Sequence, residues 1–341
     1  MATLMIRSQW LLNRLAVIHG AAALAVLLTL PVSPAQAQAP AAAANPALPG
    51  WAYPVNPPFP EWDTKVLHRV PGSTKEFTQA QVENDFAPPD WHPEDHPALP
   101  SVVSSGRPPA VRACMKCHLT NGGGHPGSSD LAGLPIGYFT EQMHAFRDGD
   151  RVGQRAAPMI PIAKAITDEE ILEAARYYNA LPPPPAGWRV IKEGDKVPET
   201  FVHTGGMRLP VPGGRKEALG NRIIELPQDV ERVELRDSRA GFQSTAPKGS
   251  FKKGEKLVKD TSGKTLPCAA CHGPDLNGLA EVPGLLGRSP LYIYRQLNDI
   301  KIGARKGGTV ALMQPVVANL TEDDMLAIAA YLTSQKPKHK S

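Results

Sequence analysis

Two short segments of this sequence carry the residue types best suited to chemistry. Each holds two cysteines separated by two residues, with a histidine directly after the second cysteine. They are Cys114, Cys117 and His118 in the first segment and Cys268, Cys271 and His272 in the second. At a Cys-x-x-Cys-His motif, two thiols bond to the vinyl groups of a haem and the adjacent imidazole binds its iron. The motifs use all four cysteines and predict two covalently bound haem c groups per chain.

The motif spacing has a geometric reason. Positions i, i+3 and i+4 share one face of a helix, so both sulfurs and the imidazole can address one haem together. Two other chemistries use such cysteine pairs: a four-cysteine structural zinc site and a pair of thioredoxin-like redox motifs. Neither explains why a histidine follows each pair, so haem attachment is favoured.

The segment around the first motif recurs around the second. A shift of 154 positions carries Cys114 onto Cys268 and continues without a gap as far as Tyr177 on Tyr331. The identical pairs include Tyr138 with Tyr292, Gln142 with Gln296, Arg151 with Arg305, Met159 with Met313 and Pro161 with Pro315. The chain therefore contains one unit twice.

The matched methionines are candidates for the second axial ligand of each iron. Met159 follows His118 by 41 residues, and Met313 follows His272 by 41 residues. A thioether opposite the histidine raises the potential and suits electron transfer. Each Met is followed by a Pro two residues later, which predicts an extended loop rather than a helix.

Two alternatives to these ligands remain. Each methionine could fill core space, as we expect for Met143 and Met325, which align with apolar residues. His125 and His144 are alternative axial ligands, although neither has a histidine at the equivalent position of the second repeat.

Both repeats contain signals for helices. Thr167 and Thr321 each begin a capping box ahead of an apolar stripe, which predicts a final helix in each repeat. Residues 251–258 predict a short amphipathic helix before the second motif. The equivalent residues 97–105 contain two prolines, so the first repeat's opening helix should be weak or displaced.

Each repeat resembles a class I cytochrome c, and the tandem is similar to the di-haem cytochromes c of the c4 type. The resemblance covers about residues 98–181 and 249–336, roughly half the chain. It implies an all-α fold of two class I domains in tandem. It also implies that Gly254 allows close packing against Tyr331 and that the Pro283 carbonyl holds the His272 ring. Ser129 occupies the position equivalent to Pro283, so the first motif lacks the matching proline.

The remaining chain is long, irregular and rich in proline. The predicted organisation is a signal peptide (1–39), a Pro- and aromatic-rich extended segment (40–97), a first cytochrome c domain (98–181), an inter-domain linker (182–248) and a second cytochrome c domain (249–341). We refer to residues 40–97 as the strap; its aromatic residues could cover a haem domain or anchor a partner protein. In the linker, residues 222–227 and 230–236 could form short strands or an irregular crossing. The c4-type connection is shorter than this linker.

The N-terminus has the features of a secretory signal. Arg7 and Arg14 precede an apolar run at 15–30 and a small-residue cleavage site at Ala35-Gln-Ala37. This predicts export to the periplasm; membrane association would follow only if the segment stayed uncleaved as an anchor.

Composition and charge narrow the function further. The 341 residues, 42% hydrophobic, suffice for about two domains, and a formal charge of +4 is too small to imply a nucleic-acid partner. The leading hypothesis is a non-enzymatic electron carrier, or the electron-transfer subunit of a dehydrogenase or oxidase system, serving redox partner proteins and having no catalytic residues. The alternative is a di-haem enzyme of peroxidase or sulfur-compound dehydrogenase type, which needs one open iron. Matched methionines favour the carrier.

Overall fold

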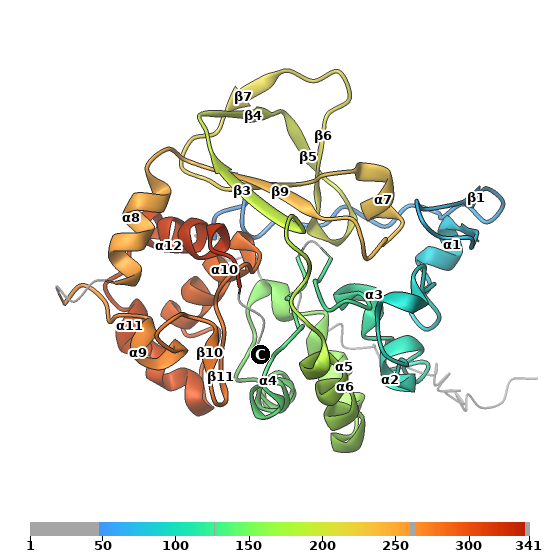
Figure 1. The fold of residues 1–341 in the computed structure, drawn as a ribbon, viewed down its shortest axis with the longest axis horizontal. Coiled ribbons are helices and arrows are strands. Elements are labelled where there is room, and N and C mark those ends of the chain that lie inside the picture. The colour runs from blue at the N-terminus through green and yellow to red at the C-terminus, as the bar shows by residue number, and fades with distance from the viewer. Residues whose placement is uncertain (1–47, 126, 260–262, 338–341) are drawn as a thin grey trace, which may run out of the picture. The chain divides into compact units, whose positions relative to one another are not determined.

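The computed structural model describes residues 48–125, 127–259 and 263–337, all within one compact unit of the chain (Figure 1). The predicted signal segment, residues 1–39, lies outside the described residues. Among the helices described, none combines the length and the apolar character needed to cross a bilayer.

The described part of the strap, residues 48–97, is mainly irregular with a few short elements. These are β1 (Leu67–His68), β2 (Phe77–Thr78), α1 (Gln79–Val82) and the 3-10 turn η1 (Pro93–Asp95). Two of its aromatic residues are buried: Tyr53 packs into the core of the second repeat, and Trp91 packs with Val82 and the linker residue Leu235. The strap therefore has two anchoring points on the rest of the molecule.

The first repeat forms a set of helices around its own apolar core. The elements are α2 (Ser101–Ser104), α3 (Met115–His118), α4 (Ile136–Asp148), η2 (Gln154–Ala156), α5 (Met159–Ala165) and α6 (Asp168–Ala180). The opening helix α2 has only four residues, as its prolines predicted. Thr167 begins α6 with the predicted capping box, because its side chain accepts from the Glu170 amide and the Glu170 side chain accepts from the Thr167 amide.

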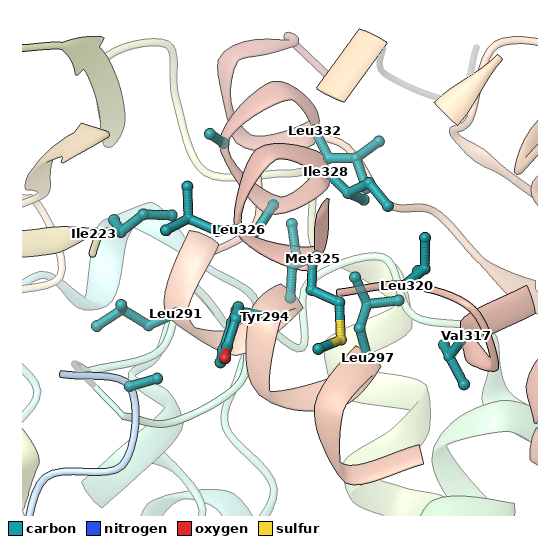
Figure 2. Packing of buried hydrophobic residues seen from close by; sticks show 14 of the residues in the cluster. Ile223, Leu291, Tyr294, Leu297, Val317, Leu320, Met325, Leu326, Ile328 and Leu332 are labelled. Carbon is teal, nitrogen blue, oxygen red and sulfur yellow. The ribbon is translucent and has the colours of Figure 1, made fainter. Parts of the chain in front are cut away.

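The second repeat follows the same order with a full opening helix. Its elements are α8 (Ser250–Val258), α9 (Ala269–His272), β10 (Gly278–Leu279), β11 (Val282–Pro283), α10 (Pro290–Lys301), η4 (Gly308–Met313), α11 (Gln314–Val317) and α12 (Glu322–Ser334). Thr321 caps α12 as predicted. Figure 2 shows Met325 among the buried side chains of this core, which also include Leu297 and Leu320. Met143 is likewise buried in the core of the first repeat, so both methionines are packing residues.

The linker shows that the predicted all-α fold describes only part of the chain. Its strands are β3 (Arg189–Glu193), β4 (Lys196–Pro198), β5 (Thr200–Val202), β6 (Arg208–Pro210), β7 (Lys216–Ala218), β8 (Ile224–Pro227) and β9 (Phe242–Ala246), with η3 (Thr204–Gly206) before β6. Strand β9 pairs in parallel with β3 and antiparallel with β8, and two-stranded pairs join β4 with β7 and β5 with β6.

One of the two linker segments that could have formed a strand or an irregular crossing is a helix instead. Residues 224–227 do form a strand, but α7 occupies Val230–Glu234. The Asp229 side chain accepts a hydrogen bond from the Arg232 amide and caps this short helix. The capping residue at its start therefore favours a helix in this segment.

Gly254 lies where α8 crosses α12, as the resemblance to class I cytochromes implied. A Cβ on Gly254 would lie 2.0 Å from the Ala327 carbonyl oxygen and 2.6 Å from the Tyr331 Cβ. Backbone oxygen cannot move aside without shifting the helix, so this crossing requires glycine.

Replacing Gly254 with alanine should therefore destabilise the second repeat. We expect a loss of roughly 1 to 3 kcal/mol in the free energy of unfolding, because α8 must move away from α12. Guanidinium unfolding followed by circular dichroism measures it. Lys256→Ala, at an exposed position of the same helix, is the control and should change stability little. Equal stability of the two variants would show that the crossing tolerates a side chain.

Candidate haem sites

One cavity gathers the four residues expected to hold the first haem. Cys114, Cys117, His118 and Met159 all line it. The cavity contains about 820 Å³ of empty space, part of it open to solvent. Much of the remaining wall is apolar or aromatic, with side chains from Leu131, Leu134, Phe139, Met143, Phe146 and Ile162. An apolar wall with two thiols, an imidazole and a thioether fits a covalently bound haem.

Helix α3 positions the first motif. Cys114 directly precedes this single turn, and His118 ends it. The His118 Nδ1 lies 2.9 Å from the Ser129 carbonyl oxygen. Because a carbonyl can only accept, Nδ1 carries the proton and Nε2 keeps a lone pair for a metal. Burial lowers the pKa of His118, which favours the neutral imidazole that metal binding requires.

The second motif is built in the same way. Cys268 precedes α9, His272 ends it, and the His272 Nδ1 lies 2.8 Å from the Pro283 carbonyl oxygen. Burial again lowers the pKa of the imidazole. The Pro283 contact implied by the resemblance is therefore present.

The first motif has the equivalent contact although Ser129 replaces the proline. In both motifs the accepting carbonyl lies 11 residues after the histidine. The acceptor is a backbone atom, so the chain path fixes the contact and the side chain at that position does not decide it. The missing proline therefore does not remove the hydrogen bond.

The two methionines do not lie in extended loops, and that prediction was wrong. Met159 is the first residue of α5, and Met313 is the last residue of η4, directly before α11. The following prolines stand in the first turn of a helix, where a missing amide proton breaks no hydrogen bond. Met159 lines the first cavity, and Met313 packs, partly buried, against the same core as Cys268.

The alternative axial ligands have other contacts. The His125 Nε2 lies 3.1 Å from the Val233 carbonyl oxygen, and the His144 Nε2 lies 3.1 Å from an Asp168 carboxylate oxygen. Neither histidine lines the first cavity.

The cysteine pairs remain separate. None of the four thiols forms a disulfide. Within the described ranges no three residues of the types His, Cys, Asp and Glu cluster closely enough to hold a metal ion, so the four cysteines do not converge on one zinc site.

The two repeats meet through a reciprocal set of hydrogen bonds that the sequence did not predict. The set comprises Tyr138, Gln142 and Arg151 with their repeat equivalents Tyr292, Gln296 and Arg305. The Arg151 Nη2 donates to the Gln296 Oε1 at 2.9 Å, and the Arg305 Nη2 donates to the Gln142 Oε1 at 2.9 Å. An antiparallel bridge joins the backbones of Arg151 and Arg305. These polar side chains are identical at equivalent positions of the two repeats, and that identity was the signal that could have pointed to this contact.

Tyr292 extends this contact to the first haem site. Its side chain comes from α10 of the second repeat, yet it lines the first cavity together with Arg151 and Gln142. The second repeat therefore contributes a side chain to the wall of the first candidate site.

A buried charged group covers the first motif. The Lys116 Nζ lies 2.7 Å from a Glu83 carboxylate oxygen of the strap, and the linker residue Arg236 donates to the same oxygen at 2.9 Å. Arg236 also donates to the Lys116 carbonyl oxygen at 2.6 Å. Burial alone would raise the pKa of Glu83, but Arg236 and Lys116 lower it to about 2. Burial lowers the pKa of Lys116 to about 8.

Comparison with known proteins agrees with this site chemistry. The family model described as "Cytochrome c" matches residues 251–336. The thiosulfate dehydrogenase electron acceptor of Thiomonas intermedia is 29% identical over 231 residues, which cover 67% of this chain and 81% of that protein.

Shorter matches are closer in sequence. Cytochrome c-554(548) of Halomonas halodenitrificans is 44% identical over 70 residues, 20% of this chain and 84% of that protein. Cytochrome c4 of Azotobacter vinelandii is 40% identical over 82 residues, 22% of this chain and 39% of that protein.

The chain belongs to the cytochrome c family and resembles the di-haem c4 type within it. It is an electron-transfer cytochrome with two covalently bound haem c groups.

The Glu83 site yields a stability prediction. Glu83→Gln should lower the free energy of unfolding by about 3 to 5 kcal/mol near neutral pH, because it leaves Lys116 and Arg236 buried without a counter-charge. Glu76→Gln, which breaks the exposed pair with Arg69, is the control and should cost less than about 1 kcal/mol. Guanidinium unfolding compares the variants.

The pH dependence of this difference in unfolding free energy tests the same site in a second way. Because folding lowers the pKa of Glu83 from 4.5 to about 2, its contribution is present above pH 4.5 and is lost as the pH falls towards 2. The stability difference between the wild type and Glu83→Gln should therefore shrink over that range. A difference independent of pH would contradict the assignment.

Proposed function

We propose that this chain is a periplasmic di-haem electron carrier in which two His/Met-ligated haems pass electrons between redox partner proteins. His118 with Met159 and His272 with Met313 would be the axial pairs, and Cys114, Cys117, Cys268 and Cys271 would form the thioether bonds. Residues 98–181 and 249–341 would be two class I domains in tandem, joined by the linker at 182–248. Residues 1–39 would direct export.

A single observation carries the proposal. Both histidines are held through Nδ1 by a backbone carbonyl, with the Nε2 atom left to bind a metal. The haem iron supplies the one-electron chemistry when the groups are bound. The task of the protein is to keep both axial positions closed, and the methionine matched to each histidine would do so.

The partner class follows from the relatives. Two of them are named as electron acceptors of thiosulfate dehydrogenase. We infer that this chain likewise accepts electrons from a dehydrogenase, as its electron-transfer partner or subunit, and does not carry out substrate oxidation itself. The di-haem enzyme alternative, of peroxidase or sulfur-compound dehydrogenase type, would need one iron without its methionine.

Carbon monoxide binding to the reduced protein tests the ligand assignment. The wild type should bind none, because both irons are six-coordinate. Met159→Ala and Met313→Ala should each bind one carbon monoxide per chain and lower the potential of one haem, while the thioether bonds stay intact. Met325→Leu is the control, since that side chain packs in the core and does not line the first cavity.

Two outcomes would contradict the proposal. A wild-type protein that binds carbon monoxide at one haem would favour the enzyme. An alanine variant that keeps its low-spin spectrum and does not bind carbon monoxide would show that the methionine is only a packing residue. His125 or His144 would then be favoured as the axial ligand.

A further inference from the structure

The two attachment helices occupy equivalent positions in the repeat but differ in what covers them. Lys116, in the middle of the first motif, is only 5% exposed, whereas its equivalent Ala270 is exposed. Cys117 is partly buried, and its equivalent Cys271 is exposed. The thioether bonds join these cysteines to the vinyl edge of each haem, so access to that edge depends on what lies over the helix.

The strap covers one side of the first attachment helix. The Lys116 Nζ donates to Glu83 at 2.7 Å and to the Val82 carbonyl oxygen at 3.2 Å. The Ala113 amide, just before the motif, donates to the Asp85 carbonyl oxygen at 2.9 Å. These contacts hold the strap directly on the motif.

The linker covers another side. Arg236 donates to the Lys116 carbonyl oxygen at 2.6 Å, and Asn121, just after the motif, donates to the Ser238 carbonyl oxygen at 2.6 Å. Leu119, which follows His118, is buried in a linker core that includes Val233. We call strap residues 77–92 and linker residues 229–240 together the cap.

The two halves of the cap also bind each other. The Trp91 Nε1 donates to the Leu235 carbonyl oxygen at 2.7 Å, and the His92 Nε2 lies 3.0 Å from an Asp237 carboxylate oxygen. The His92 and Asp237 side chains are both fully buried. The cap is therefore a packed structure and not a loosely lying loop.

Among the residues that the structure describes, the second attachment helix has no such cover. No hydrogen bond among the described residues joins α9 to the strap or to the linker. Helix α9 instead packs against β10 and β11 of its own repeat. Leu279, in β10, is 57% exposed.

The reciprocal hydrogen bonds between the repeats offer an internal route to the covered site. Tyr292 and Arg151 belong to that contact and also line the first cavity. The second repeat therefore forms part of the wall of the covered site.

We propose that the second haem, attached at Cys268 and Cys271, exchanges electrons with external proteins, and that a protein-sized partner, unlike a small reductant, reaches the first haem only through it. A reduced partner protein would be oxidised by one electron, and the haem held at Cys114 and Cys117 would be reduced by that electron after it passes by way of the second site. No bond or proton would move. This inference rests on the proposed di-haem carrier function.

Substitution of Ala270 by tryptophan tests it on the holoprotein. Stopped-flow kinetics measure reduction by photoreduced flavodoxin, a protein-sized reductant. Reduction of both haems should slow by about fivefold or more, because the bulky side chain obstructs the only place where a protein can deliver electrons. Reduction by dithionite, a small reductant, should change by less than about twofold. Leu279→Trp repeats the test from β10.

Glu231→Trp, on an exposed position of α7 in the cap, is the matched control and should leave both flavodoxin rates unchanged. Each haem contributes about half of the absorbance change on reduction by flavodoxin. If half or all of that change keeps its wild-type rate in Ala270→Trp, the first haem takes electrons directly and the inference is overturned. Haem content and carbon monoxide binding, measured on the same samples, test the carrier function separately.

Discussion

The hydrogen bond from each histidine Nδ1 to a backbone carbonyl is the constraint on which the sites depend. It fixes the tautomer, so Nε2 keeps a lone pair for a metal, and it restrains the rotation of the ring. The donor and acceptor stand at the same separation along the chain in both repeats. The loop between them must therefore fold back over the attachment helix, and the wall of each haem site follows from that path.

A second constraint is the burial of charge where the linker meets both repeats. Arg189 of β3 donates to Asp130 of the first repeat and to Glu225 of β8, and all three side chains are nearly inaccessible. Glu225 also accepts from Ser289 of the second repeat. A buried charge is tolerated only when it is fully paired. The buried charges of the linker and the first repeat therefore depend on partners from more than one segment, including the second repeat.

The sequence predicted the parts of this molecule that depend on local signals. Capping boxes at Thr167 and Thr321, the glycine at the α8–α12 crossing and the motifs themselves act within a few residues or within one repeat. The methionine loops were mispredicted because a proline is equally compatible with the first turn of a helix. The contacts of Lys116 with Glu83 and Arg236 were not predictable, because they join segments far apart in the chain with no periodic pattern.

The most direct test of the account is a proton NMR spectrum of the fully reduced protein. The haem ring current shifts protons lying over the iron far upfield, so a coordinated methionine is identified by its isolated ε-methyl signal. The account predicts two such signals, with Met159→Ala and Met313→Ala each removing a different one. A spectrum with one signal or none would contradict two closed His/Met sites.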